Sequence, residues 1–189
     1  MASLPLPTVS VDYYLGFEEG NSEKHEFVDG YMVAMAGASP DHSTITINVS
    51  SAITARLNRS VCRPYSSDMR ITTDALTTWL YPDFLVVCGT PEYIDTKPKT
   101  LLNPTFLVEV LSPSTAVYDR TLKAPRYKAC ASVKEFLLVE QSPARVEHWK
   151  RSSAGDWELE TVSGADAVLK LESLGVELPL REFYTGLEL

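Results

Sequence analysis

The run FLVEVL, residues 106–111, constrains the fold of this chain more than any other segment. It is apolar and rich in strand-favouring residues, and Ser112-Pro113-Ser114 ends it, so it predicts a buried β-strand. Glu109 nevertheless lies in its middle. Because a buried carboxylate without a partner is costly, two interpretations are open. Either strand alternation turns Glu109 toward solvent, or its carboxylate meets a cation inside the protein.

A second acid stands directly before another apolar strand. The sequence YPDFLVVC places Asp83 at the head of the run Phe84–Cys88. The chain between Asp83 and Glu109 is long enough for a strand, a loop and a return strand, so both carboxylates can meet at one sheet edge. Two such carboxylates repel each other unless a divalent cation lies between them. Because no His/Cys cluster accompanies them, the expected ion is Mg²⁺ or Mn²⁺ and not zinc.

The rest of the chain alternates between helical and strand-like patterns. Apolar residues recur every four positions from Ile45 to Leu57, after a helix start at Ser39-Pro40-Asp41, and they predict an amphipathic helix. Asp29-Gly30 between two strand-like runs predicts a hairpin. Further helices are expected at 11–20, at 115–132 with a kink or break at Pro125, and at 180–184. Further strands are expected at 61–74, 76–89, 134–141, 144–151 and 156–162, and a surface loop at 91–104.

This order of elements predicts the fold class. It favours an α+β fold with α/β-like features, in which a mixed β-sheet core is flanked by helices. An N-terminal helix and hairpin precede the core, and additional strands follow it. We expect one domain over residues 1–189, with its core at about 11–184, because no repeat, low-complexity tract or linker interrupts the chain.

Charge and cysteine content narrow the class of protein further. The net charge of −8 and the pI of about 4.9 are the opposite of what a protein that coats DNA usually carries, so contact with nucleic acid must be local, transient or metal-assisted. Cys62, Cys88 and Cys130 are odd in number and widely spaced, which predicts reduced, mostly buried thiols in a cytoplasmic protein. No apolar run is long enough to span a membrane, so no membrane-spanning segment is expected.

Two further residues are weaker candidates for a functional site. Glu26 lies beside the predicted hairpin, and Lys123 lies on the helix that follows Glu109. For each of them, a solvated position on a strand or helix is the simpler alternative.

Five motifs in this order resemble the Uma-type endonuclease family, which is assigned to the restriction-endonuclease-like, PD-(D/E)XK superfamily. They are HEFVDGYMVAMAGASPDHS, YPDFLVVCG, LVEVLSPST, YDR-x-x-K-x-x-x-Y and VKEFLLVEQ. The similarity extends from about Val11 to Tyr184. It implies a restriction-endonuclease-like fold with an acidic, metal-dependent nuclease site.

The superfamily pattern has a Pro-Asp at the head of one strand and an acid-x-Lys on the next. Pro82-Asp83 and Glu109 match its acids, but Leu111 stands where the lysine is usual. The resemblance implies that Lys123 replaces this lysine from the following helix. It also implies that Glu26 is the acid of the first helix or hairpin.

Three more residues complete the implied site. The backbone carbonyl of Val110 would bind the metal together with Asp83 and Glu109. Tyr127, one helical turn after Lys123, would line the same pocket. His42 belongs to a family motif, although local capping or packing is an equal alternative for it.

The implied activity is hydrolysis of phosphodiester bonds with Mg²⁺ or Mn²⁺ as cofactor. The implied partner is nucleic acid, DNA before RNA, and a homodimer would supply the second surface that a small acidic nuclease needs to grip a duplex. Two alternatives stay open. One is a catalytically degraded module that binds metal or protein; the other is a structural domain in which Glu109 pairs with Arg63, Arg70 or Arg126.

Overall fold

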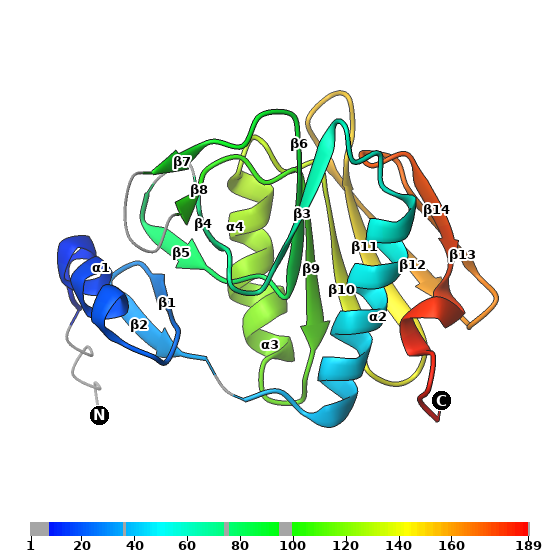
Figure 1. Ribbon diagram of the computed structural model, residues 1–189, viewed down its shortest axis with the longest axis horizontal. Coiled ribbons are helices and arrows are strands. Elements are labelled where there is room, and N and C mark those ends of the chain that lie inside the picture. Colours follow the sequence, from blue (N-terminus) through cyan, green and yellow to red (C-terminus); the bar gives the residue numbers. More distant parts are fainter. Residues whose placement is uncertain (1–7, 36, 74–75, 95–99, 189) are drawn as a thin grey trace.

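The computed structural model describes residues 8–35, 37–73, 76–94 and 100–188 (Figure 1). Within these residues the chain forms two six-stranded sheets and one separate two-stranded hairpin, with helices packed against them. This is the predicted α+β architecture. None of the described helices is long and apolar enough to cross a membrane.

The larger mixed sheet forms the centre of the molecule. Its strand order is β12-β11-β10-β9-β6-β3. These strands are β3 (Cys62–Ser66), β6 (Phe84–Cys88), β9 (Phe106–Leu111), β10 (Glu135–Glu140), β11 (Arg145–Arg151) and β12 (Trp157–Ser163). Strands β9 and β10 are parallel and all other pairs are antiparallel. Parallel strands need a crossover connection, and the helical segment between them supplies it.

Helices cover both faces of this sheet. Helix α2 (Pro40–Arg56) covers one face together with the hairpin β13–β14 (Val168–Leu171 and Val176–Pro179) and the 3₁₀ turn η2 (Leu180–Tyr184). Ile45, Val49 and Ile53 are fully buried there, which confirms the predicted period. The crossover of α3 (Ala116–Tyr118), η1 (Asp119–Lys123) and α4 (Ala124–Ala129) covers the other face (Figure 1).

The second sheet packs beside the crossover and carries the N-terminal elements. Its order is β2-β1-β5-β4-β8-β7. The strands are β1 (His25–Val28), β2 (Tyr31–Ala34), β4 (Arg70–Thr72), β5 (Thr78–Leu80), β7 (Tyr93–Ile94) and β8 (Thr100–Leu101), with helix α1 (Val11–Gly20) packed on them. Asp29 and Gly30 both have positive φ, 49° and 94°, as the tight turn between β1 and β2 requires.

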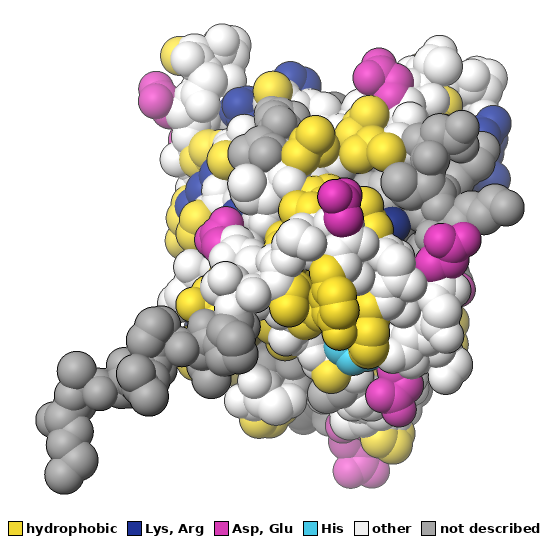
Figure 2. Space-filling view, turned by 90° about the vertical axis from the view of Figure 1, so that its left-hand side faces the viewer, with side chains coloured by type: hydrophobic (Ala, Val, Ile, Leu, Met, Phe, Trp, Pro, Cys, Tyr) yellow, Lys and Arg dark blue, Asp and Glu magenta, His cyan; other side chains and the backbone are white. Residues whose placement is uncertain are grey.

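Figure 2 shows the side of the molecule on which α1 and the β1–β2 hairpin lie. Hydrophobic side chains gather near its centre, acidic side chains surround them, and lysines and arginines are scattered. On α1 the exposed fractions of Tyr13 and Phe17 are 57% and 37%. Among the described residues, this face therefore presents no continuous basic surface.

Two predictions about strands were wrong. The expected loop at 91–104 contains the short strands β7 and β8, although 95–99 lie outside the described residues. The hairpin β13–β14 was missed altogether. Both errors have one cause: strands of two to four residues, stabilised by their neighbours, are too short to show a periodic pattern.

The prediction of three reduced cysteines was also wrong. Cys62 and Cys88 form a disulfide between β3 and β6, whereas Cys130 is buried outside it. The antiparallel register places Cys62 directly opposite Cys88, with Cα atoms 4.0 Å apart. Cysteine spacing along the chain could not reveal this pairing, because it depends on which strands are neighbours.

Candidate functional site

A cleft of about 860 Å³ opens between α2, the start of β6, the end of β9 and the crossover helix. Its lining includes Glu26, His42, Asp83, Glu109, Val110 and Lys123, so six of the seven predicted site residues share one space. The seventh, Tyr127, is fully buried and contacts Glu109 directly.

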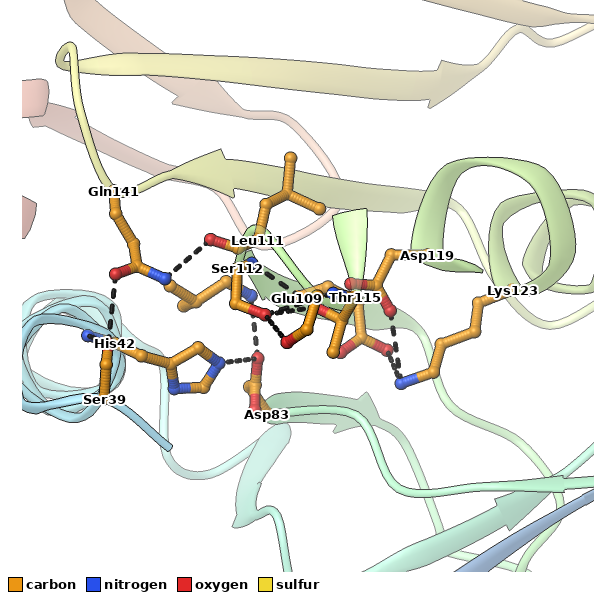
Figure 3. Close-up of polar contacts among 12 residues, drawn as sticks. Ser39, His42, Asp83, Glu109, Leu111, Ser112, Thr115, Asp119, Lys123 and Gln141 are labelled. Carbon is orange, nitrogen blue, oxygen red and sulfur yellow. Dashed lines mark hydrogen bonds and ion pairs between the residues drawn. The ribbon is translucent and has the colours of Figure 1, made fainter. Parts of the chain in front are cut away.

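Asp83 and Glu109 are neighbours across two strands, as the sequence predicts. Phe84 of β6 pairs with Val108 of β9, so the next antiparallel position places Asp83 opposite Glu109. Asp83 Oδ2 accepts a hydrogen bond of 2.7 Å from the backbone N–H of Val110. His42 Nε2 lies 3.2 Å from the same oxygen (Figure 3). These two contacts fix the Asp83 carboxylate at the end of the β6–β9 strand pair that borders the cleft.

Glu109 is buried, with an exposed fraction of 3%, so the interpretation that it faces solvent was wrong. Its Oε1 accepts hydrogen bonds from the ammonium of Lys123, at 3.1 Å, and from the hydroxyl of Tyr127. Burial raises the pKa of Glu109 well above its ordinary value, and the nearby carboxylates raise it further. Glu109 thus lies in an apolar strand with a lysine as its cationic partner.

Two of the three arginines of the ion-pair alternative, Arg70 and Arg126, have other partners. Arg70 Nε donates to the Thr100 hydroxyl at 2.9 Å, and Arg126 pairs with Asp29. The acid in the strand is therefore neutralised from the crossover and not by Arg70 or Arg126.

Lys123 reaches the cleft from the crossover. Its Nζ lies 2.9 Å from Glu26, 3.1 Å from Glu109 and 3.5 Å from Asp119, and the exposed fraction of the residue is 6%. Burial alone would lower the pKa of Lys123, but these three carboxylates outweigh it and raise the pKa well above its ordinary value. The ammonium group is therefore charged and held by three acids.

A π-helical turn, η1, sets this geometry. The N–H of Ala124 donates to the carbonyl of Asp119, five residues earlier, and Pro125 follows without an N–H of its own. The predicted break at Pro125 is thus absorbed by one wider turn. That turn buries both Asp119 and Lys123 against the cleft.

Asp119 is a site residue that sequence reasoning missed. Its exposed fraction is 2%, and burial raises the pKa of its carboxyl group. The signal was present as the Asp-x-x-x-Lys spacing of 119–123, but on a solvated helix this spacing is a common surface pair. Asp119 becomes part of the cleft only because the π-helical turn is buried.

Glu26 is likewise buried, with an exposed fraction of 3%. Its Oε1 accepts the backbone N–H of Tyr81, at 3.0 Å, besides contacting Lys123. The alternative of a solvated strand position for Glu26 was therefore wrong, as it was for Lys123.

A chain of hydrogen bonds fixes the start of α2 against the end of β9. Gln141 donates to the Leu111 carbonyl at 2.8 Å and accepts from the Ser39 hydroxyl at 3.1 Å (Figure 3). Ser39 also caps α2 by accepting the N–H of His42. His42 is therefore held at both its backbone and its ring. No periodic pattern in the sequence marks Gln141.

The cleft contains more acid than base. Glu26, Asp83, Glu109 and Asp119 face one lysine and one histidine. Such an excess of hard oxygen ligands suits Mg²⁺ or Mn²⁺. Among the described residues no group of three or more His, Cys, Asp or Glu is arranged to ligate a metal ion by itself. Magnesium is usually bound by one or two carboxylates with water and substrate phosphate, so the pair Asp83 and Glu109 fits it.

The fold and the cleft together define the class of protein: an α+β protein with a restriction-endonuclease-like core. The chain belongs to the Uma2 family, described as "Putative restriction endonuclease", whose family model matches residues 11–181.

The chain is also similar to individual proteins. The chain is 33% identical to the uncharacterized protein slr1290 of Synechocystis sp. over 98% of its own length and 96% of the relative's. It is 31% identical to the uncharacterized protein sll1609 of the same organism, over 86% and 92% of the two chains. Its fold matches the crystal structure of "a putative nuclease belonging to DUF820" from Anabaena variabilis, with a TM-score of 0.65, 18% identity and coverage of 85% and 89%.

Proposed function

We propose that this protein is a metal-dependent nuclease that hydrolyses phosphodiester bonds in nucleic acid, with DNA preferred over RNA. The observation that carries the proposal is the position of Asp83 and Glu109, opposite each other on paired strands at one cleft, with the Lys123 ammonium 3.1 Å from Glu109. Two acids that can hold a divalent cation and a lysine that can stabilise negative charge are groups that metal-assisted phosphodiester hydrolysis uses.

The carboxylates would hold the metal. Asp83 and Glu109 would be its protein ligands, with the Val110 carbonyl beside them and Glu26 as a further ligand, direct or through water. A bound Mg²⁺ or Mn²⁺ supplies a Lewis acid that polarises a phosphoryl oxygen and lowers the pKa of a bound water. The acid excess of the cleft supports this role. Burial raises the pKa of Glu109 and the neighbouring acids raise it further, and a divalent cation would favour the charged carboxylate.

Lys123 and His42 would act on either side of the acids. The Lys123 ammonium would orient the attacking water or stabilise negative charge on the phosphoryl oxygens. His42 would hold the Asp83 carboxylate in place, since its ring contacts Asp83 Oδ2 at 3.2 Å. The hydrogen bonds to Asp83 outweigh burial and raise the pKa of His42, which favours a charged ring beside the carboxylate.

Cleavage and metal binding test the proposal separately. Wild type with Mg²⁺ or Mn²⁺ should nick plasmid or single-stranded DNA, and Glu109→Gln should reduce nicking to the level of a reaction without protein. Glu160→Gln is the matched control, because Glu160 is an exposed acid on β12 that pairs with Lys150 outside the cleft. Nicking by Glu109→Gln at the wild-type rate would contradict the assignment.

Metal binding is measured by thermal unfolding. Titration with Mn²⁺ should raise the melting temperature of wild type but not that of Asp83→Ala, because binding to the native state alone stabilises it. Equal shifts of the melting temperature in both proteins would contradict metal binding at Asp83 and Glu109.

A catalytically degraded module is the second candidate. Leu111 in place of the usual lysine and the threefold clamp on Lys123 by acids favour it. It predicts a Mn²⁺-dependent rise in melting temperature that requires Asp83, together with no cleavage of any nucleic acid. Lys123→Ala distinguishes the two: in a nuclease it lowers turnover and leaves metal binding largely intact.

A further inference from the structure

The cleft offers little positive charge to a nucleic-acid backbone. Lys123 is the only Lys or Arg among the described residues that line it, and its ammonium is shared by Glu26, Glu109 and Asp119. Affinity for duplex DNA depends largely on lysines and arginines that neutralise phosphates along both strands. With a net charge of −8 on the chain, the cleft is poorly suited to grip a duplex.

One wall of the same cleft is apolar and reachable from solvent. Val33 and Met35 line it from β2 and the segment after it, and Ile47 lines it from α2. The exposed fractions of Val33 and Ile47 are 36% and 64%. Ile47 lies outside the four-residue period that buries the core face of α2, so its side chain is available to a ligand.

Hydroxyl groups surround this wall. Ser39, which caps α2, and Ser43 and Thr46 within α2 contribute some of them, and Ser112, Ser114 and Thr115 contribute others from the turn after β9. Hydroxyls can donate to or accept from the edge of a base or a phosphate without adding charge. An apolar wall with neutral hydrogen-bonding groups at its rim is the composition expected of a pocket for a nucleobase.

The cleft is large enough to hold a nucleotide. At about 860 Å³ it falls in the range of roughly 300–1,000 Å³ that is typical of pockets for small organic ligands. The carboxylate pair lies in the same cleft as the apolar wall, so one guest can reach both.

We propose that the wall formed by Val33, Met35 and Ile47 binds one unstacked base of a single-stranded segment, and that single-stranded nucleic acid is therefore the substrate class. The inference rests on the proposed nuclease function. Contact between a base and a side-chain surface is independent of the protein's net charge, and it requires a strand whose bases are free of their partners.

Binding to labelled oligonucleotides tests the base contact. The probe is a fluorescein-labelled oligothymidylate of ten nucleotides, measured by fluorescence anisotropy with the full-length protein in Ca²⁺. An oligonucleotide of equal length and charge with abasic sites should bind about 10-fold more weakly, because it lacks the base. The corresponding duplex should also bind about 10-fold more weakly, because its bases are paired.

Variants locate the contact. Ile47→Ser and Val33→Ser should each weaken binding of oligothymidylate by about 5- to 10-fold, because each removes apolar surface that the base would cover, and leave binding of the abasic oligonucleotide unchanged. Leu159→Ser is the matched control, because Leu159 is 48% exposed on β12 and does not line the cleft. A ribo-oligonucleotide of the same length extends the comparison to RNA; binding within 10-fold of the deoxy form assigns both polymers to the site.

Binding and cleavage results together separate an error in the base-binding wall from an error in the nuclease function. Equal affinity for oligothymidylate, abasic oligonucleotide and duplex would overturn the inference, as would an absence of binding to all three. Cleavage of duplex as fast as of single strands would also overturn it, while leaving the nuclease function intact. Base-dependent binding without cleavage of any substrate would uphold the inference and contradict the proposed function.

Discussion

Glu109 and Glu135 are two glutamates buried to the same extent, on neighbouring parallel strands, in opposite chemical surroundings. Each has an exposed fraction of 3%. Glu135 accepts backbone N–H bonds from Glu172 at 3.0 Å and Ser173 at 2.8 Å, a hydroxyl from Ser173, and contacts His148 at 3.2 Å. Glu109 shares its space with three other acids and one lysine.

The electrostatic outcome is opposite at the two positions. Burial opposes ionisation of Glu135, but hydrogen bonds from His148 and Ser173 outweigh it and lower the pKa of its carboxyl group. Burial and neighbouring acids raise the pKa of Glu109. A buried acid with a complete set of donors stabilises the fold, here by attaching the β13–β14 turn to β10. A buried acid crowded by other acids costs stability, and such clusters mark functional sites.

The largest effect should follow removal of the cleft's cation. Lys123→Met leaves three buried carboxylates without their ammonium, so we expect a loss of about 3–5 kcal/mol in the free energy of unfolding. Urea unfolding at neutral pH measures it. The double variant Lys123→Met/Glu109→Gln should recover part of this loss, because it removes one of the unpaired charges.

The same measurement on His148→Gln sharpens the comparison. His148 supplies one of several hydrogen bonds to Glu135, so its removal should cost less than removal of Lys123. If His148→Gln proves the more costly change, the two acids do not differ in the way described.

Neutralising each glutamate should then have unequal consequences. Glu135→Gln weakens the bonds from the β13–β14 turn to a charged acceptor and should cost about 2–3 kcal/mol. Glu109→Gln should change stability by no more than about 1 kcal/mol, because Lys123 keeps Glu26 and Asp119 as partners. Denaturant unfolding of the two variants side by side checks this, and equal losses would contradict it.

The pH dependence of stability should show that Glu135 is ionised in the folded protein. Its pKa in the folded protein lies below its ordinary value of 4.5, so the folded state binds fewer protons than the unfolded state in that range. Its contribution is therefore present above pH 4.5 and is lost as the pH falls through the folded pKa. The stability difference between wild type and Glu135→Gln should shrink below pH 4.5. A difference that stays constant with pH would mean that Glu135 is already neutral.

The smallest effect is expected at the edge of the cleft. Gln141→Ala removes the bonds to Leu111 and Ser39 and should cost about 1 kcal/mol. The contact of His42 with Asp83 should loosen with it, so that turnover falls more than stability alone explains. If Gln141→Ala is less stable but cleaves at the wild-type rate, Gln141 supports the fold without positioning the site.

Strong periodicity made much of the fold predictable. The four-residue period of α2 and the apolar runs of β6, β9 and β10 were visible because these elements bury a continuous apolar surface. The Asp29-Gly30 turn was visible because these residue types accept the positive φ that a tight turn requires. Strands β7, β8, β13 and β14 were not, because their neighbours define them. The Cys62–Cys88 bond followed from a register that no local pattern encodes.

The site was predictable where an acid contradicts its neighbours. Asp83 directly precedes an apolar strand and Glu109 lies inside one. A charged residue among apolar neighbours identified both as candidates. Asp119 and Gln141 lie within the motifs YDR-x-x-K and VKEFLLVEQ but were not predicted as site residues, because an acid on a helix and a glutamine in a turn are ordinary in any sequence. Their roles depend on the wider turn at η1 and on the parallel pairing of β9 with β10.

The π-helical turn also has a consequence for how members of this family diverge. A single-residue deletion within 119–123 would restore ordinary helical winding and rotate everything before it by about a quarter of a turn relative to α4. Lys123 and Tyr127 would then no longer meet Glu109 from the same side as Asp119. Loss of a single codon in this segment would therefore keep the fold and change the arrangement of charged residues in the cleft.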